Sequence, residues 1–223
     1  MHTRLVLFDL DGTLVRSMEL YAEKASELMN RYYGVEPSEG RELYLKTSGL
    51  PFLEQLNVLF PDKGELNRKV AQHFENWKRE IIKSLKLERE GVEVINELKS
   101  LGFMTAVSSN NLQEYVEDII SRSGAKPHFV LGWDGKGFKK GEPHVSFLER
   151  ETGIRREFFL MVGDSPNDLK LSKNCGIKFV ALTSEFPPQA FKEIDSDVPT
   201  IENLTELLPV LLPSERPSAI LPR

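Results

Sequence analysis

The sequence feature that most constrains the fold is a series of short apolar runs, most of them bounded by glycine, aspartate, serine or asparagine. The five runs are Leu5–Leu10, Phe103–Val107, Phe129–Leu131, Phe158–Val162 and Lys178–Leu182. Strands that are apolar along their whole length are typical of parallel sheets buried on both faces. Segments with helical spacing of apolar residues lie between the later runs or follow them: 92–101, 112–121, 145–151 and 203–212. This alternation predicts an α/β fold in which helices cover both faces of a parallel sheet.

The segment between the first two runs does not follow this alternation. It contains three stretches with a helical pattern, Ser17–Tyr33, Phe52–Phe60 and Glu65–Leu85, and no convincing strand. We therefore expect a core formed by residues 1–15 and 87–212, with a small helical domain inserted at residues 16–86. Residues 213–223 include three prolines and are predicted to form a loose C-terminal tail.

Composition argues against several classes of protein. The 223 residues carry a net charge of −5 and a single cysteine, Cys175. A nucleic-acid-binding protein would show a basic excess, and one cysteine cannot form an internal disulfide. No apolar run approaches the length of a membrane span, and the N-terminus becomes charged too early for a signal peptide. We expect a soluble cytoplasmic protein without a nucleic-acid or membrane partner, whereas the sequence leaves the oligomeric state open.

Two acids directly follow the first apolar run, in the sequence Asp9-Leu10-Asp11-Gly12-Thr13. Ligands of open parallel sheets bind beyond the carboxyl ends of the strands. Neighbouring carboxylates repel each other, so a cation is their natural partner, and Mg²⁺ suits hard oxygen ligands that it shares with a substrate phosphate. Gly12 would let the backbone turn sharply and approach a phosphate. The same residue types are common in solvated turns, so this motif does not identify a site by itself.

Three further groups with complementary chemistry follow predicted strands. They are a second acid pair at Asp164 and Asp168, the hydroxyl and amide groups of Ser108, Ser109 and Asn110, and the positive charges of Lys139 and Lys140. Hydroxyls can hold phosphate oxygens and a lysine can offset their charge. An acid pair, a hydroxyl, a lysine and a second acid pair, in that order along the chain, together predict a phosphate-handling site.

This combination resembles the haloacid dehalogenase-like (HAD) superfamily. Its four motifs match, in order, Asp9-x-Asp11-Gly12-Thr13, Ser108, Lys140 and Gly163-Asp164-x-x-x-Asp168, and the resemblance extends from about Leu5 to Leu212. It implies a Rossmann-like parallel sheet core with a cap domain. Because the long insertion lies between the first and second motifs, the resemblance implies a helical cap of the C1 type.

The resemblance also implies roles for the acids. Asp9 would attack phosphorus and form an aspartyl-phosphate. Asp11 would protonate the leaving alcohol and later activate water. The cofactor Mg²⁺ would be held by Asp9, by the main-chain carbonyl of Asp11 and by Asp164, with Asp168 acting through water or as an orienting group. An acid at position 11 indicates transfer of a phosphoryl group from a phosphate ester or anhydride.

The remaining motif residues are expected to bind the phosphate. Ser108 is preferred to Ser109 as the phosphate-holding hydroxyl because it directly ends the apolar run. Lys140 is preferred to Lys139 because Pro143 and the helix after it then fall into register with the motif. Groups expected to contact the substrate also include Gly12, Thr13, Ser109 and Asn110.

Arg16 departs from the family pattern. Relatives with this cap often have Leu-Val-Asp-Ser at this place, whereas this chain has Leu14-Val15-Arg16-Ser17, with arginine in place of the aspartate. We expect its guanidinium to face the cleft and to bind a second anionic group of the substrate through two hydrogen bonds. The alternative is a solvent-exposed arginine that pairs with Glu19 or Glu23.

The favoured activity is Mg²⁺-dependent hydrolysis of a small phosphorylated metabolite. The segment Thr47-Ser48-Gly49-Leu50-Pro51 is similar to a cap segment of phosphoglycolate phosphatases, which makes such a substrate the first candidate. One alternative is a sugar phosphomutase of the β-phosphoglucomutase kind. Another is a non-catalytic aspartyl-phosphate switch, although the long interval between Thr13 and Ser108 argues against a compact receiver domain.

Overall fold

The computed structural model describes residues 3–212, so the predicted tail at residues 213–223 lies outside the described residues. Within that range six parallel strands form one sheet in the order β3-β2-β1-β4-β5-β6. This is the order of doubly wound, Rossmann-like sheets, in which the connections reverse direction beside the first strand. The predicted α/β class with a parallel sheet core is confirmed.

Five of the strands lie where the apolar runs predicted them. The six strands are β1 (Leu5–Phe8), β2 (Met104–Leu112), β3 (Phe129–Trp133), β4 (Phe159–Gly163), β5 (Lys178–Leu182) and β6 (Thr200–Ile201). Strand β2 extends past the apolar run into Ser108–Leu112, so the polar residues of the second motif belong to the strand itself. Strand β6 was not predicted, because two residues are too few to form a recognisable pattern.

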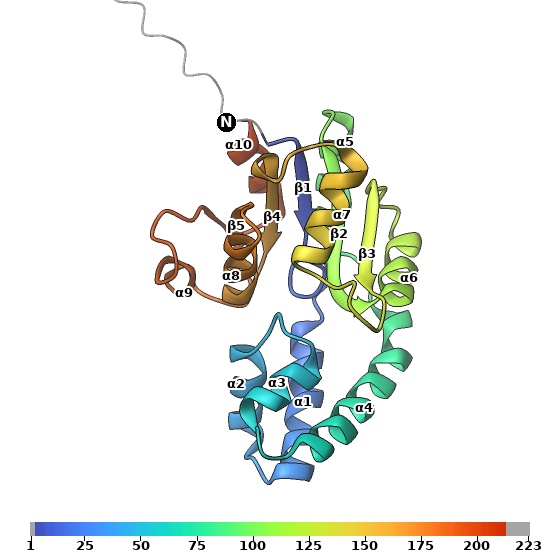
Figure 1. The fold of residues 1–223 in the computed structure, drawn as a ribbon, viewed down its shortest axis with the longest axis vertical. Coiled ribbons are helices and arrows are strands. Elements are labelled where there is room, and N and C mark those ends of the chain that lie inside the picture. The colour runs from blue at the N-terminus through green and yellow to red at the C-terminus, as the bar shows by residue number, and fades with distance from the viewer. Residues whose placement is uncertain (1–2, 213–223) are drawn as a thin grey trace, which may run out of the picture.

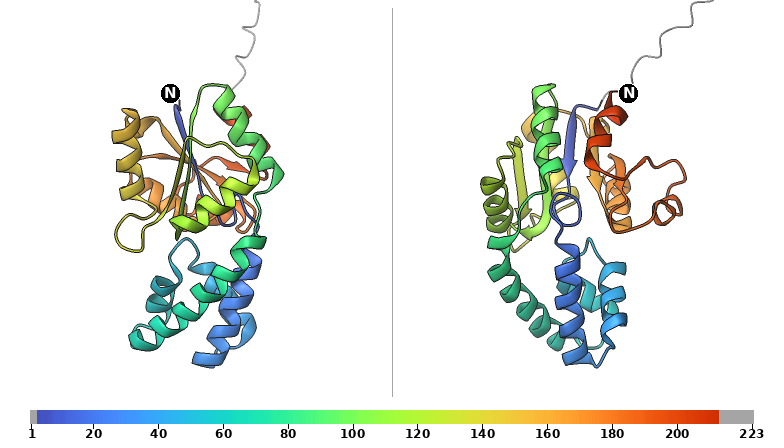
Figure 2. Two further views of the ribbon diagram at one scale, coloured as in Figure 1. Left: turned by 90° about the vertical axis from the view of Figure 1, so that its right-hand side faces the viewer. Right: turned by 180° about the vertical axis from the view of Figure 1, so that it is seen from behind.

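Helices cover both faces of the sheet, as Figure 2 shows in its left-hand view. One face carries α5 (Arg89–Ser100), α6 (Gln113–Ser123) and α10 (Leu207–Leu211), and the other carries α7 (Glu142–Thr152), α8 (Pro166–Asn174) and α9 (Pro188–Lys192). Short 3₁₀ turns precede β4 at Arg156–Phe158 and α10 at Leu204–Glu206. In β1, Val6 and Phe8 point to the first face and Leu5 and Leu7 to the second, all at most 1% exposed. Each such buried side chain stabilises the fold by about 1.5–3 kcal/mol.

Four helices between β1 and α5 form a separate body below the sheet in Figure 1. They are α1 (Met18–Tyr33), α2 (Pro37–Lys46), α3 (Phe52–Leu59) and α4 (Gly64–Ile81), followed by a 3₁₀ turn at Ile82–Ser84. Helix α2 was not predicted, because it buries only Gly40 and Tyr44 and therefore has a weak apolar periodicity. Pro37 begins α2 with a backbone angle that suits the first turn of a helix. We call the four helices and this turn the cap.

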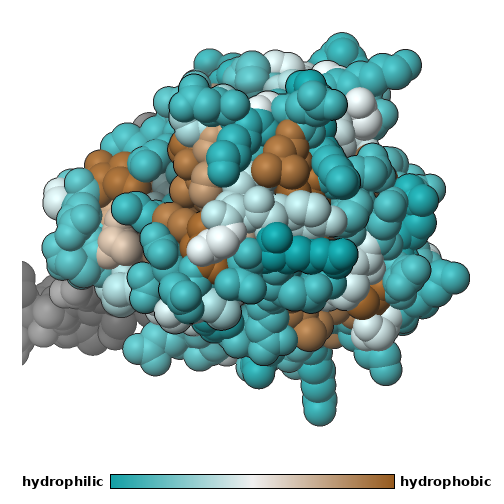
Figure 3. All heavy atoms as spheres, turned by 90° about the horizontal axis from the view of Figure 1, so that it is seen from below, coloured by the Kyte–Doolittle hydropathy of each residue, from teal (hydrophilic) through white to brown (hydrophobic). Residues whose placement is uncertain are grey.

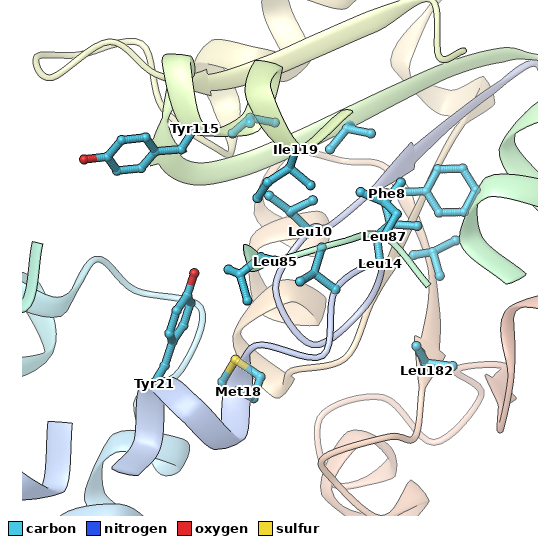
Figure 4. Packing of buried hydrophobic residues seen from close by; sticks show 14 of the residues in the cluster. Phe8, Leu10, Leu14, Met18, Tyr21, Leu85, Leu87, Tyr115, Ile119 and Leu182 are labelled. Carbon is cyan, nitrogen blue, oxygen red and sulfur yellow. The ribbon is translucent and has the colours of Figure 1, made fainter. Parts of the chain in front are cut away.

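Two linkers run side by side between the sheet and the cap. The backbone N–H of Glu88 donates to the carbonyl of Leu14 at 2.8 Å, which ties the outgoing linker to the returning one. Apolar side chains fill the space around both linkers, and Figure 4 shows Leu10, Leu14 and Leu85 packed there between the sheet and the cap. One apolar cluster therefore continues from the sheet into the cap, and it holds the cap over the carboxyl ends of the central strands.

The cap side of the surface is mainly hydrophilic. Figure 3 views the molecule from this side and shows hydrophobic residues in small groups separated by hydrophilic ones. Across residues 3–212, no helix combines the length and the apolar character that a membrane crossing requires.

Candidate active site

Three buried acids meet at the carboxyl ends of two neighbouring strands. Asp9 follows β1, and Asp164 and Asp168 follow β4. Every residue of β1 pairs with a residue of β4. The backbone N–H of Asp9 donates to the carbonyl of Val162 at 2.9 Å, which continues the pairing of the two strands to the first acid. One carboxylate oxygen from each of the three acids lies within 4.8 Å of the others. The structure thus brings together two motifs that lie about 150 residues apart in the chain.

The turn after Asp9 packs its backbone against Asp164. The backbone N–H groups of Leu14 and Val15 both donate to the carbonyl of Leu10, which closes a tight turn. Gly12 lies in this turn with φ +81°, and a Cβ atom there would lie 2.1 Å from Asp164 Oδ2. Only glycine can therefore occupy this position without displacing the acid.

Gly12 and Thr13 do not line the cavity above the acids, although both were expected to contact the substrate. Thr13 Oγ1 instead donates to Asp164 Oδ1 at 3.1 Å. The expected substrate contact of Gly12 and Thr13 stays a prediction, because the side chain of Thr13 is engaged with Asp164 in this structure. Thr13 orients this acid from below, and Gly12 makes room for it.

Lys140 is the cation within the acidic cluster. Its Nζ lies 2.5 Å from Asp9 Oδ1 and 2.5 Å from Asp168 Oδ1, and its side chain is 3% exposed. Burial alone would lower the pKa of Lys140, but Asp168 and Asp9 raise it above its ordinary value. Lys139 points elsewhere and pairs with Glu54 of α3 at 2.7 Å. The geometry therefore agrees with the predicted choice of Lys140 over Lys139.

The cluster contains more negative charge than Lys140 can balance. Burial raises the pKa of Asp9 to about 7, with Asp168 and Asp11 adding to the rise and Lys140 opposing it. Burial, Asp9 and Asp168 likewise raise the pKa of Asp164 well above its ordinary value. Asp164 Oδ2 is buried and has no hydrogen-bond partner among residues 3–212. Three hard oxygen donors, one of them unpartnered, fit a divalent metal ion.

Asp11 lines the same cavity but lies outside the group of three acids. Its Oδ1 accepts a hydrogen bond from Ser17 Oγ at 2.6 Å, and its Oδ2 accepts one from Asn111 Nδ2 at 2.7 Å. Both donors fix the orientation of the carboxylate. Neither donor was predicted from the sequence, although Asn111 directly follows the second motif and Ser17 directly precedes α1.

Ser108 does not reach the cavity, so the preference for Ser108 as the phosphate-holding hydroxyl is wrong. Its Oγ lies 2.8 Å from Nδ1 of the buried His144, whereas Ser109 lines the cavity. The physical reason is that Ser108 and Ser109 point to opposite faces of β2, whose pairing with β3 becomes irregular after Ser108, so that the following residues all line the cavity. Asn110 also lines the cavity, as expected, and its amide donates to the carbonyl of Gly49 in the cap at 3.0 Å.

His144 makes the stability of the protein depend on pH. The residue is fully buried, and its Nε2 lies 3.1 Å from the carbonyl oxygen of Gly132, so Nε2 carries the proton and Nδ1 accepts from Ser108. Burial lowers the pKa of His144 to about 4. In the unfolded chain this histidine binds a proton near pH 6.5, whereas in the native state it does so only near pH 4. The contribution of neutral His144 to the free energy of unfolding is therefore fully present above pH 6.5 and is lost as the pH falls towards 4. We expect this residue to account for a loss of about 3 kcal/mol across that interval.

Urea unfolding at pH 7, 5.5 and 4.5 measures this effect. His144→Gln should lose less stability than the wild type on acidification, because glutamine does not bind a proton. His73→Gln, which replaces a partly buried cap histidine, serves as the matched control and should follow the wild type. Equal acid sensitivity of the wild type and His144→Gln would contradict the assignment.

Arg16 lies outside the cavity, so the expectation that it faces the cleft is wrong. Its side chain is 83% exposed, and its Nε lies 3.4 Å from Glu88 Oε2 on the neighbouring linker. The residue precedes α1 on the outer side of the two linkers, where the solvent is within reach. Its partner is Glu88, and neither Glu19 nor Glu23 pairs with it.

The loop between α2 and α3 brings the cap onto the core. Asn167 Nδ2 of α8 donates to the carbonyl of Ser48 at 2.5 Å, next to the contact between Asn110 and Gly49. Gly49 has φ +87°, and a Cβ atom there would lie 3.0 Å from Asn167 Cβ. Core and cap together line a cavity of about 80 Å³ above the acids, with Tyr21, Tyr44, Phe74 and Lys78 among its cap residues.

Comparisons with known proteins agree with this geometry. The chain is 28% identical over 225 residues to phosphoglycolate phosphatase of Vibrio vulnificus, covering 95% of this chain and 97% of that one. It is 26% identical over 218 residues to pyrophosphatase PpaX of Bacillus mycoides, covering 95% and 98%. Among solved structures, a hydrolase from Pseudomonas syringae has a TM-score of 0.77 at 15% identity, covering 96% of this chain and 100% of that one. A haloacid dehalogenase-like hydrolase from Streptococcus pneumoniae has a TM-score of 0.74 at 16% identity, covering 93% and 98%.

The family model described as haloacid dehalogenase-like hydrolase matches residues 6–182, which include both acid pairs, the lysine and the whole cap. The two solved structures support the same fold across nearly the whole chain. This chain therefore belongs to the haloacid dehalogenase-like hydrolase family.

Proposed function

We propose that this protein is a Mg²⁺-dependent phosphatase that hydrolyses a small phosphate ester or anhydride through an aspartyl-phosphate. The observation that carries the proposal is the position of Asp9, which lies in contact with Lys140 at the bottom of a cavity that Asp11 also lines. A nucleophile, a cation and a separate acid–base group are what phosphoryl transfer to a carboxylate requires.

Asp9 and Asp11 divide the reaction between them. A carboxylate oxygen of Asp9 attacks phosphorus, the bond from phosphorus to the leaving oxygen breaks, and Asp11 gives that oxygen its proton. Asp11 then takes a proton from water, whose oxygen attacks phosphorus and releases phosphate with Asp9 restored. The hydrogen bonds from Ser17 and Asn111 hold Asp11 in place for both steps.

The phosphoryl group would be held by the end of β2. Ser109 and Asn110 line the cavity beside the acids, and we propose that they take the role first expected of Ser108. Lys140 offsets the charge of the transferring group while it keeps Asp9 and Asp168 in position.

Mg²⁺ would be held by Asp9 and Asp164, with the main-chain carbonyl of Asp11 and with Asp168 as a supporting group. When bound, it supplies positive charge to the phosphate oxygens and to the crowded acids. The unpartnered Asp164 Oδ2 and the excess of carboxylates over lysine support this assignment.

Metal removal tests the assignment. We expect excess chelator to lower the rate of phosphate release by at least about a hundredfold, because loss of the charge partner leaves the transition state uncompensated. Mg²⁺ should restore the rate and should also raise the melting temperature, since a ligand held at a hundred times its dissociation constant stabilises the fold by about 2.7 kcal/mol. Asp164→Asn should weaken both responses. Full activity in excess chelator would contradict a metal-dependent reaction.

The size of the cavity favours a compact substrate. Its volume of about 80 Å³ is far smaller than the roughly 300–1,000 Å³ of pockets for drug-sized ligands. The named relatives, a phosphoglycolate phosphatase and a pyrophosphatase, support a substrate of this size. The deciding experiment is a measurement of phosphate release from phosphoglycolate, pyrophosphate and a hexose phosphate. We expect turnover of at least one of the compact substrates, whereas isomerised hexose phosphate without free phosphate would favour a phosphomutase.

A further inference from the structure

The cap places three unpartnered polar groups in the cavity. They are the hydroxyl of Tyr21 on α1, the hydroxyl of Ser48 in the loop after α2, and the ammonium of Lys78 on α4. All three residues are more than nine-tenths buried. Neither hydroxyl has a hydrogen-bond partner among residues 3–212. Unpaired buried hydroxyls are costly, and the same cavity wall carries a cation without an acidic partner, which together favour a ligand at this place.

Lys78 is the charged member of the three. It is 8% exposed, and within residues 3–212 it forms no ion pair with an acidic side chain. Its Nζ lies 4.8 Å from the centre of the Tyr21 ring and 5.8 Å from that of the Phe74 ring. Such cation–π contacts are worth about 0.5–2 kcal/mol and leave the positive charge of Lys78 without a counterion. Glu75, one turn earlier on α4, also lines the cavity but does not pair with Lys78.

The other cationic side chain of the cavity already has acidic partners. Among the described residues that line it, the basic side chains are Lys78 and Lys140, and Lys140 contacts both Asp9 and Asp168. The cavity therefore carries positive charge at two places, and only Lys78 on the cap wall lacks an acidic partner. An anion at the second place would be the counterion that Lys78 lacks.

Tyr21 can donate a hydrogen bond to such an anion. Figure 4 shows its ring rising from α1 with the hydroxyl directed towards the core. Burial and the nearby Asp11 raise the pKa of Tyr21 well above its ordinary value, although the Tyr21 hydroxyl does not reach hydrogen-bonding geometry with Asp11. Ser48 lies in the loop that contacts the core, and this residue lines the same space.

We propose that Lys78, Tyr21 and Ser48 form a cap subsite that binds a second anionic group of the substrate, apart from the phosphoryl group that is transferred. This inference rests on the proposed phosphatase activity and names its substrate class: compact phosphate esters or anhydrides that end in a carboxylate or a second phosphate. Lys78 thus takes the role first expected of Arg16, which lies on the outer surface.

The experiment compares matched substrates in Lys78→Met, which keeps the length and apolar stem of the side chain. Phosphoglycolate ends in a carboxylate, pyrophosphate ends in a phosphate, and 2-hydroxyethyl phosphate ends in a neutral hydroxyl. We expect KM to rise about 10- to 100-fold for the anionic substrate that the wild type prefers, as loss of a charged hydrogen bond does, with kcat nearly unchanged. The kcat/KM of the neutral ester should change by less than about threefold.

Matched variants separate this role from a structural one. Lys24→Met removes a cap lysine that pairs with Glu27 and does not line the cavity, and it should leave all three substrates unaffected. Lys78→Arg keeps the charge and should recover part of the lost KM for the anionic substrate. Tyr21→Phe should raise the same KM by a smaller factor, about two- to tenfold, because it removes a neutral donor.

The possible outcomes distinguish the two proposals. If the wild type releases phosphate from none of the three substrates, the proposed function is overturned and the subsite falls with it. If the wild type is active and Lys78→Met leaves its selectivity unchanged, or lowers activity equally on anionic and neutral esters, only the subsite is overturned. Selective loss on pyrophosphate rather than phosphoglycolate would support the subsite and identify the second group as a phosphate.

Discussion

Asp9→Asn is expected to lower kcat by at least about ten-thousandfold, because loss of a covalent nucleophile removes the reaction path itself. An amide cannot form the aspartyl-phosphate, although it fills the same space beside Lys140. The burst of released alcohol and the covalent phosphoprotein, measured by rapid quench with a radiolabelled substrate, should both disappear. A variant that still accumulates labelled protein at the wild-type rate would remove Asp9 from the role of nucleophile.

Asp11→Asn provides the matched control within the same motif. It keeps the nucleophile but loses the proton donor, while its amide oxygen can still accept one of the two hydrogen bonds that Ser17 and Asn111 donate. Its defect should therefore be smaller for a good leaving group such as nitrophenol than for an alkyl alcohol. Equal losses on both kinds of substrate would contradict the acid–base role of Asp11.

Lys140→Ala is expected to lower kcat by at least about a hundredfold, as the loss of a transition-state charge partner does. The lysine contacts two buried carboxylates, so its removal should also lower the free energy of unfolding by about 3–5 kcal/mol in the absence of metal. Steady-state kinetics and urea unfolding of the same preparation measure the two effects together. Because Asp9 and Asp168 lose their positive neighbour, Mg²⁺ should recover part of the stability but little of the rate.

Lys139→Ala is the control for this variant, because it removes the adjacent lysine. The Lys139–Glu54 pair is exposed on both sides, at 41% and 45%, and such pairs contribute about 0–1 kcal/mol. We expect turnover within about twofold of the wild type and nearly unchanged stability. A large loss in Lys139→Ala with a mild effect in Lys140→Ala would overturn the assignment of the motif lysine.

The sheet could be predicted from the sequence because its strands are buried on both faces. A strand such as Phe159–Gly163 must be apolar along its whole length, so its signal survives without any knowledge of its neighbours. Helix α2 and strand β6 left no comparable signal. The helix buries only two residues and the strand has only two, so contacts with other elements determine both.

The two serines of the second motif show a further limit of prediction from the sequence. In a strand, neighbouring residues point to opposite faces, so a shift of one position exchanges a cavity residue for a core residue. The end of the apolar run suggested Ser108, but β2 continues to Leu112, and the contact with His144 takes Ser108 away from the cavity. Where a strand ends is decided by pairing with β3, which the sequence of β2 does not contain.

The sequence by itself determined five strands of the sheet, the helical insertion and the acids that follow β1 and β4, because strand burial and motif order are properties of the chain. Asp9 and Asp164 meet wherever β1 and β4 pair. Only the tertiary structure decided which basic side chain of the insertion enters the cavity. Arg16 and Lys78 are both cations near the ends of cap helices, and their different positions depend on how the cap packs against the core. That packing brings together surfaces that are distant in the sequence, so no local sequence pattern predicts it.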